Sequence, residues 1–218
     1  MPIVTKYTDV PGWSDFFYIH NRIIEFLPDN ANILEVGVGF GRSTWTLLDC
    51  MKTNMQLSVL DSFAHYDSFS FWQHSLETNC VNTLDEENTK QLAVLSQQFS
   101  QQELFLHFIK QHPSYSKLET VYSMTSKEYM NKKYNSNYDL VFLDGDHSYN
   151  MVKQELNFFK NCRVIAGHDY MNCVTPGVTV AVDEFLIQNP DRKFAYDEEN
   201  SVFLIHRSDD HFEFEYNN

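Results

Sequence analysis

The chain has 218 residues, of which 43% are hydrophobic and 15% aromatic, and this composition excludes a disordered chain and suffices for one domain with a full core. Sixteen basic residues against thirty acidic ones give a formal net charge of −14, which disfavours a nucleic-acid partner because phosphates need facing cations. The sequence lacks a signal-peptide pattern and any apolar run near the roughly 18 residues of a membrane helix, so we expect no membrane partner. The four cysteines form no Cys-x-x-Cys pair, so we expect reduced thiols and a cytoplasmic protein.

Apolar residues at helical spacing predict a first helix over residues 14–27, with Ser14 as its N-cap and Pro28 as its stop. Strands and helices then alternate along most of the chain, and the strands are short apolar runs, as buried parallel strands are. The expected strands are 33–36, 56–60 ending at Asp61, 118–122, 138–143, 163–166, 194–196 and 201–206. The later helices are expected at 42–51, 126–133, 150–160 and 178–188.

This alternation predicts an α/β fold with a Rossmann-like, doubly wound sheet of seven strands, mostly parallel and closed by a C-terminal antiparallel hairpin. Residues 62–116 interrupt the pattern as a helical insertion after the second strand, with helices near 85–98 and 100–111. The chain shows no repeat or linker, so we expect a single domain over 1–218, in which the insertion covers a ligand site. The tail 208–218 is either an edge strand or a frayed end.

Several aromatic side chains of the insertion follow the second strand closely. They either line a ligand pocket or a lid, or pack as a satellite core, and the sequence leaves both interpretations open. These residues are Phe63, Tyr66, Phe69, Phe71 and Trp72.

A glycine-rich turn follows the strand 33–36, with the pattern Glu35-x-Gly37-x-Gly39-x-Gly41. Glycines let the backbone turn tightly and approach a ligand closely. The spacing differs from the Gly-x-Gly-x-x-Gly pattern of dinucleotide sites. This difference favours contact with the amino-acid part of an adenosyl ligand over phosphate binding. Asp61, at the end of the next strand, could accept hydrogen bonds from ribose hydroxyls. The alternative is an ordinary strand-to-helix turn.

Two acidic motifs follow later strands: Asp144 to His147 (DGDH) after 138–143, and Gly167 to Tyr170 (GHDY) after 163–166. Neighbouring strands lie about 4.8 Å apart, so Asp144 and Asp169 could converge on one divalent cation. His147 could accept a proton from a substrate hydroxyl. Alternatively, Asp146 and His147 only cap the next helix.

Taken together, the segments EVGVGFGRST, LDSF, FLDGDHSY and AGHDY with GVTVAVDEFL resemble the class I S-adenosylmethionine-dependent methyltransferases. More narrowly, they are similar to the small-molecule branch with macrocin-type sugar O-methyltransferases and, more distantly, catechol and caffeoyl-CoA O-methyltransferases. The resemblance covers roughly residues 30–61 and 118–188. DGDHSY followed by GHDY is its specific part, because the whole class shares the glycine motif.

The resemblance implies a role for each matching position. S-adenosylmethionine would bind with its methionine part at the glycine turn, its ribose at Asp61 and its adenine at the turn 123–125. The implied cofactor-binding residues are Glu35, Gly37, Gly39, Gly41, Ser43, Asp61, Ser62, Met124, Thr125 and Asp144. The implied catalytic residues are His147, as general base, and Asp144.

The implied metal ligands are Asp144, His168 and Asp169. Macrocin-type enzymes carry two adjacent acids at the last of these motifs and catechol-type enzymes carry Asp-Asn, whereas here the pair is His168-Asp169. A histidine suits Mg²⁺ poorly beside carboxylates. The sequence therefore leaves two alternatives open: the site binds Mg²⁺ or another divalent cation, or it works without a metal.

The reaction implied by the resemblance is methyl transfer from S-adenosylmethionine to a hydroxyl of a small acceptor, such as a sugar, which the insertion 62–116 would cover. The chain could form a homo-oligomer. One alternative is a non-catalytic S-adenosylmethionine-binding or assembly protein that keeps the fold. An NAD-dependent dehydrogenase is disfavoured, because Tyr129-x-x-x-Lys133 precedes the strand 138–143 instead of following it.

Overall fold

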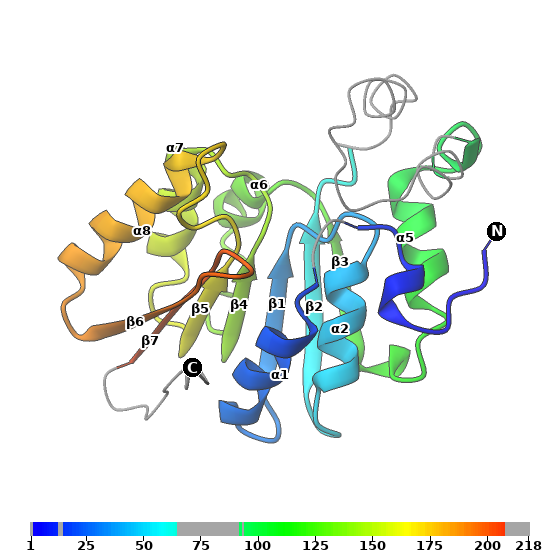
Figure 1. Cartoon of the computed structure of the whole chain (residues 1–218), viewed down its shortest axis with the longest axis horizontal. Helices are drawn as coiled ribbons and strands as arrows, with labels where there is room; N and C mark the ends of the chain where they lie inside the picture. The colour runs from blue at the N-terminus through cyan, green and yellow to red at the C-terminus, as the bar shows by residue number, and fades with distance from the viewer. Residues whose placement is uncertain (1, 13–14, 65–91, 93, 208–218) are drawn as a thin grey trace.

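The computed structural model describes residues 2–12, 15–64, 92 and 94–207, and a seven-stranded sheet runs through this part of the chain (Figure 1). The strands are β1 (Asn32–Val36), β2 (Gln56–Asp61), β3 (Leu118–Ser123), β4 (Leu140–Leu143), β5 (Val164–Gly167), β6 (Arg192–Asp197) and β7 (Val202–Arg207). Their order is β3-β2-β1-β4-β5-β7-β6. The first five pair in parallel, and β7 runs antiparallel between β5 and β6. The predicted fold class is therefore confirmed.

The helices lie close to where the sequence predicts them. They are α1 (Phe17–Phe26), α2 (Arg42–Cys50), α5 (Gln101–Ile109), α6 (Ser126–Asn131), α7 (Tyr149–Phe158) and α8 (Pro176–Gln188), with 3-10 turns η1 (Tyr7–Asp9) and η2 (Tyr115–Lys117). The first helix starts later than expected, because Phe16 occupies the N-cap position and is buried against Phe142. Ser14, the expected N-cap, lies outside the described residues. Within the described ranges, no helix has the length and apolar character needed to cross a membrane.

Two hydrophobic cores lie on the two faces of the sheet. Successive side chains of a strand point to opposite faces, so Ile33 belongs to one core and Leu34 to the other. Helices α1, α2 and α5 contribute to the core around Ile33, and α6, α7 and α8 to the core around Leu34 (Figure 1). Both faces are thus covered, as a parallel sheet requires.

Strand register places the functional motifs together. Val36 at the end of β1 pairs with Leu60 of β2 and with Leu143 of β4, and Leu143 in turn pairs with Gly167 of β5. The residues that follow these positions therefore emerge at the same carboxyl edge of the sheet, where ligands of open α/β sheets bind.

The described end of the insertion packs against the glycine turn. Helix α5 confirms the helix expected near 100–111, and its Ile109 lies against Gly41. Phe63 is buried, with its ring centroid 5.4 Å from that of Phe105, so this aromatic residue belongs to the core. Most of the helix expected near 85–98 and the tail 208–218 lie outside the described residues. So do Tyr66, Phe69, Phe71 and Trp72.

Candidate active site

A pocket of about 880 Å³ opens at the carboxyl edge of the sheet, within the roughly 300–1,000 Å³ range of small-molecule sites. Predicted site residues that line it are Gly37, Gly39, Ser43, Asp61, Ser62, Met124, Thr125, Asp144, His147, His168 and Asp169. Glu35 and Gly41 do not line it. Residues that the sequence reasoning missed also form its wall; they include Pro11, Gly12, Phe16, Arg42, Gln101, Lys127 and Met151.

The glycine turn is shaped by close contacts that only glycine allows. Gly37 has a φ of 81°, and a Cβ there would lie 2.2 Å from the carbonyl oxygen of Asp144. Gly41 has a φ of 100° and occupies the N-cap position of α2. The first glycine thus lets the end of β1 touch the end of β4, and the last one turns the chain into α2.

The Asp61 carboxylate organises this turn. Its Oδ2 accepts hydrogen bonds from the backbone N–H groups of Val38 (2.8 Å) and Gly39 (3.2 Å), and its Oδ1 accepts one from Phe63 (2.7 Å). The side-chain amide of Gln101 donates to the carbonyl oxygen of Gly39 at 3.0 Å. The end of β2 and the start of α5 therefore fix the turn from two sides, a role that the motif spacing does not reveal.

Glu35 lies beneath the pocket and is fully buried. Its carboxyl group accepts hydrogen bonds from the hydroxyls of Ser43 and Thr44. Burial, opposed by these hydrogen bonds, raises the pKa of Glu35 to about 8, so the group is mostly neutral near pH 7. It secures the first turn of α2 and orients Ser43, which does reach the pocket.

Four side chains meet at the ends of β4 and β5. His147 lies between two carboxylates, with Nε2 3.4 Å from Oδ1 of Asp144 and Nδ1 3.3 Å from Oδ2 of Asp169. Nδ1 of His168 lies 3.3 Å from the same Asp144 oxygen and 3.5 Å from Oδ1 of Asp169. Asn172 donates to that Asp169 oxygen at 2.6 Å. The structure thus brings both predicted motifs into one cluster.

The opposite charges in this cluster stabilise one another and shift the pKa values of its members. Burial alone would lower the pKa of His147, but Asp144 and Asp169 outweigh it and raise that pKa above its ordinary value. The pKa of His168 is raised for the same reason. Burial alone would raise the pKa of Asp144, but the two histidines outweigh it and lower that pKa. Asp144 is therefore ionised near neutral pH, and His147 is a stronger base than a free histidine.

A cation bridging Asp144 and Asp169 does not match this pairing, because the imidazole of His147 occupies the space between the two carboxylates. Across the described ranges, no group of three or more His, Cys, Asp or Glu side chains is arranged to hold a metal ion. The positive charge that balances the carboxylates is available from the two histidines.

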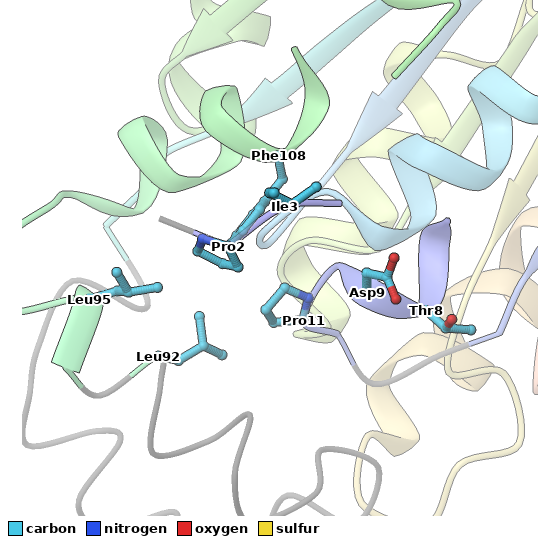
Figure 2. A pocket seen from close by; sticks show the side chains of 8 residues that line it. All are labelled: Pro2, Ile3, Thr8, Asp9, Pro11, Leu92, Leu95 and Phe108. Atoms are coloured by element: carbon cyan, nitrogen blue, oxygen red, sulfur yellow. The ribbon is translucent and has the colours of Figure 1, made fainter. Parts of the chain in front are cut away.

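The N-terminal segment 2–12 supplies part of the pocket wall that the sequence did not predict. Pro11 and Gly12 are buried there, and the ring of Phe16 lies 5.0 Å from that of His168. Pro11 also lines a second, smaller pocket of about 240 Å³, between this segment and the side chains of Leu92, Leu95 and Phe108 (Figure 2). Arg42 is a missed residue with a sequence signal, because it directly follows the glycine motif.

A family model for methyltransferase domains matches residues 34–184, which is more than half of the chain. The chain belongs to this family. The match and the sheet order confirm the predicted class I methyltransferase. No curated protein matches the chain by sequence.

Solved structures share the fold of this methyltransferase. An O-methyltransferase from Bacillus cereus in complex with SAH has a TM-score of 0.53 at 13% identity, over 91% of this chain and 84% of that one. A Corynebacterium glutamicum protein has a TM-score of 0.55 at 12% identity, over 91% and 83%. CalS11, a TDP-rhamnose 3′-O-methyltransferase of calicheamicin biosynthesis, has a TM-score of 0.52 at 14% identity, over 89% and 78%.

Proposed function

We propose that this methyltransferase transfers the methyl group of S-adenosylmethionine to a hydroxyl of a small molecule, with His147 as the general base. The observation that carries the proposal is that one pocket joins the glycine turn and Asp61 to the cluster around His147. A donor and an acceptor held in one pocket react as if in one molecule, which supplies much of the rate.

The donor would lie along the carboxyl ends of β1, β2 and β3. Its methionine part would face the turn from Gly37 to Ser43, and its adenine would face Met124 and Thr125, all of which border the pocket except Gly41. Asp61 uses three hydrogen bonds for the protein backbone, and an ionised carboxylate has about four acceptor positions. A ribose hydroxyl would thus donate to the acceptor position of Asp61 that the backbone of the turn leaves open.

The acceptor would lie at the His147 end of the pocket. The Nε2 of His147 lies 3.4 Å from Oδ1 of Asp144, and His147 lines the pocket, so this nitrogen can take a proton from a ligand while Asp144 stabilises the charge that results. As the acceptor oxygen attacks the methyl carbon, the carbon–sulfur bond breaks, S-adenosylhomocysteine leaves, and the hydroxyl proton moves to Nε2. Asp144 and Asp169 orient the imidazole and stabilise its protonated form.

A sugar or a similar polyhydroxylated molecule is the proposed acceptor. Carboxylates accept hydrogen bonds from hydroxyls, and the buried ring of Phe16 beside His168 offers an apolar surface to a sugar ring. CalS11, which shares the fold, is described as acting on TDP-rhamnose, and this supports the class without naming the molecule.

A divalent cation at Asp144, His168 and Asp169 stays a prediction. The observed pairing of the histidines with the carboxylates does not favour it, and the proposed proton transfer needs no cation. The cytoplasm is the proposed compartment, and a homo-oligomer is the proposed assembly.

The test combines binding and turnover. Calorimetric titration of the protein with S-adenosylmethionine and S-adenosylhomocysteine should show one site, and binding of neither would refute the proposal. Transfer of labelled methyl groups should then be measured on sugar nucleotides, glycosides and catechols. Binding without transfer to any acceptor would favour the alternative, a non-catalytic S-adenosylmethionine-binding or assembly protein.

A further inference from the structure

The first residue of α2 brings a permanent positive charge into an otherwise acidic pocket. Among the lining residues that the structure describes, Arg42 and Lys127 carry such a charge, whereas four aspartates line the same pocket: Asp61, Asp144, Asp146 and Asp169. An anionic part of a ligand would be repelled by these carboxylates unless it lies close to one of the two cations. The two histidines of the pocket are already paired with Asp144 and Asp169, so Arg42 and Lys127 are the candidates to receive it.

Arg42 is held in place from the side of the N-terminal segment. Its Nε donates to the carbonyl oxygen of Val10 at 2.8 Å, and its Nη2 donates to that of Thr8 at 3.4 Å. A Cβ on Gly12 would lie 2.8 Å from the Cβ of Arg42, so the segment passes directly against this side chain. A guanidinium has five N–H donors, and these two contacts leave others for a ligand.

The position of Arg42 favours an anion, and Asp15 is the nearby carboxylate of the chain itself that acts on its charge. It stands at the first helical position of α2, where the helix dipole disfavours a cation. A carboxylate bound beside it would offset this cost and gain charge-assisted hydrogen bonds. Neighbouring Ser43 and the glycine turn are also where the proposed function puts the methionine part of the donor.

We propose that the guanidinium of Arg42 binds the α-carboxylate of S-adenosylmethionine. The inference rests on the proposed function, which sets the direction of the donor in the pocket. Lys127 follows Met124 and Thr125 at the proposed adenine end, and adenine carries no negative charge. Lys127 is therefore the matched control, a second cation of the same pocket that has no carboxylate to bind.

The experiment compares S-adenosylmethionine with decarboxylated S-adenosylmethionine, which keeps the adenosyl group, the sulfonium and the amine. Calorimetry measures both affinities in the wild-type chain, Arg42→Met, Arg42→Gln and Lys127→Met. We expect the wild-type chain and Lys127→Met to bind the carboxylated ligand roughly 10–100 times more tightly than the decarboxylated one. Both Arg42 variants should lose most of this ratio and bind the decarboxylated ligand about as well as the wild-type chain does. The Gln variant keeps an amide that can donate to Val10, so it separates carboxylate binding from anchoring of the segment.

Three outcomes would overturn the inference. If both Arg42 variants weaken the two ligands equally, Arg42 only anchors the N-terminal segment, and the proposed function still stands. If Lys127→Met removes the preference and the Arg42 variants keep it, the carboxylate lies at the other end of the pocket. If the wild-type chain binds neither ligand, the proposed function itself fails together with this inference.

Discussion

The Nδ1 atom of His147 lies 3.3 Å from Oδ2 of Asp169, and this contact joins the loop after β4 to the loop after β5. It follows from the strand register, because Leu143 and Gly167 are paired neighbours at the ends of these strands. One ring nitrogen is thereby engaged by Asp169, while the other lies 3.4 Å from Oδ1 of Asp144, and the residue lines the pocket. This arrangement leads to two predictions about the proposed base.

Replacing the base should slow the chemistry and leave donor binding intact. His147→Ala should lower kcat by roughly 10²–10⁴, because the acceptor hydroxyl then loses its proton without help. The affinity for S-adenosylmethionine should stay within about threefold, since the loss concerns the transition state. Methyl-transfer kinetics and calorimetry measure the two quantities. Near-normal turnover would reduce His147 to a structural residue of the loop.

The pH dependence should report the raised pKa of His147. The base must be neutral to accept a proton, so kcat/KM should rise as the pH increases through the pKa of His147, which its carboxylate neighbours raise above the ordinary histidine value. Asp169→Asn removes one of the charges that raise this pKa, so the rise should move to lower pH. Asn tolerates the observed φ of 65° at position 169.

Asp183→Asn is the matched control for this pH experiment, because Asp183 accepts a hydrogen bond from Tyr170 and does not line the pocket. Its pH profile should follow that of the wild-type enzyme. An unshifted profile in Asp169→Asn would show that His147 does not control the rate.

Asp61 should matter for donor binding through two effects. Asp61→Ala removes the proposed ribose contact and the three hydrogen bonds to the backbone of Val38, Gly39 and Phe63. We expect S-adenosylmethionine to bind more weakly by about 1.5–3 kcal/mol, the scale for hydrogen bonds to a charged group. Calorimetry gives the affinity, and a thermal melt shows the accompanying loss of stability. Unchanged affinity would remove Asp61 from the cofactor site.

The close approach of β1 and β4 predicts a contrast between two glycines. Gly37→Ala places a Cβ 2.2 Å from the Asp144 carbonyl oxygen at a φ of 81°, and should lower the free energy of unfolding by about 3 kcal/mol or more. The neighbouring Gly145 has room, since the nearest atom to an added Cβ is 3.5 Å away. Gly145→Ala should therefore change stability by less than about 1 kcal/mol. Denaturant unfolding measures both, and equal losses would contradict the observed turn geometry.

Chelation separates the two alternatives for the acidic cluster. If His147 fills the space between Asp144 and Asp169, turnover should persist after EDTA treatment and buffer exchange. Addition of Mg²⁺ or Mn²⁺ should then raise kcat by less than about twofold, because no step depends on Lewis-acid help. Loss of activity in EDTA with recovery on Mg²⁺ would show that a cation displaces the imidazole from this space.

Much of the fold was predictable because its signals are local. Apolar runs such as residues 140–143 are typical of buried strands of a covered sheet, and their alternation with helical patterns predicts the doubly wound fold. The boundaries shifted by a few residues where packing intervened, as at Phe16, whose burial delays the start of α1. In the insertion, the helix near 100–111 was predictable and begins with a capping box of Ser100 and Glu103, but its contact with Gly41 was not, because that contact joins distant parts of the chain.

By itself, the sequence determined which chemistry-bearing residues follow which strand, because parallel strands deliver their carboxyl ends to one edge. Only the tertiary structure decided which partner each of these residues contacts. It buried Glu35 beneath Ser43, assigned Asp61 to the backbone of the turn, and set His147 between two carboxylates. These pairings depend on distances between separate strands and loops, and spacing along one chain does not encode them.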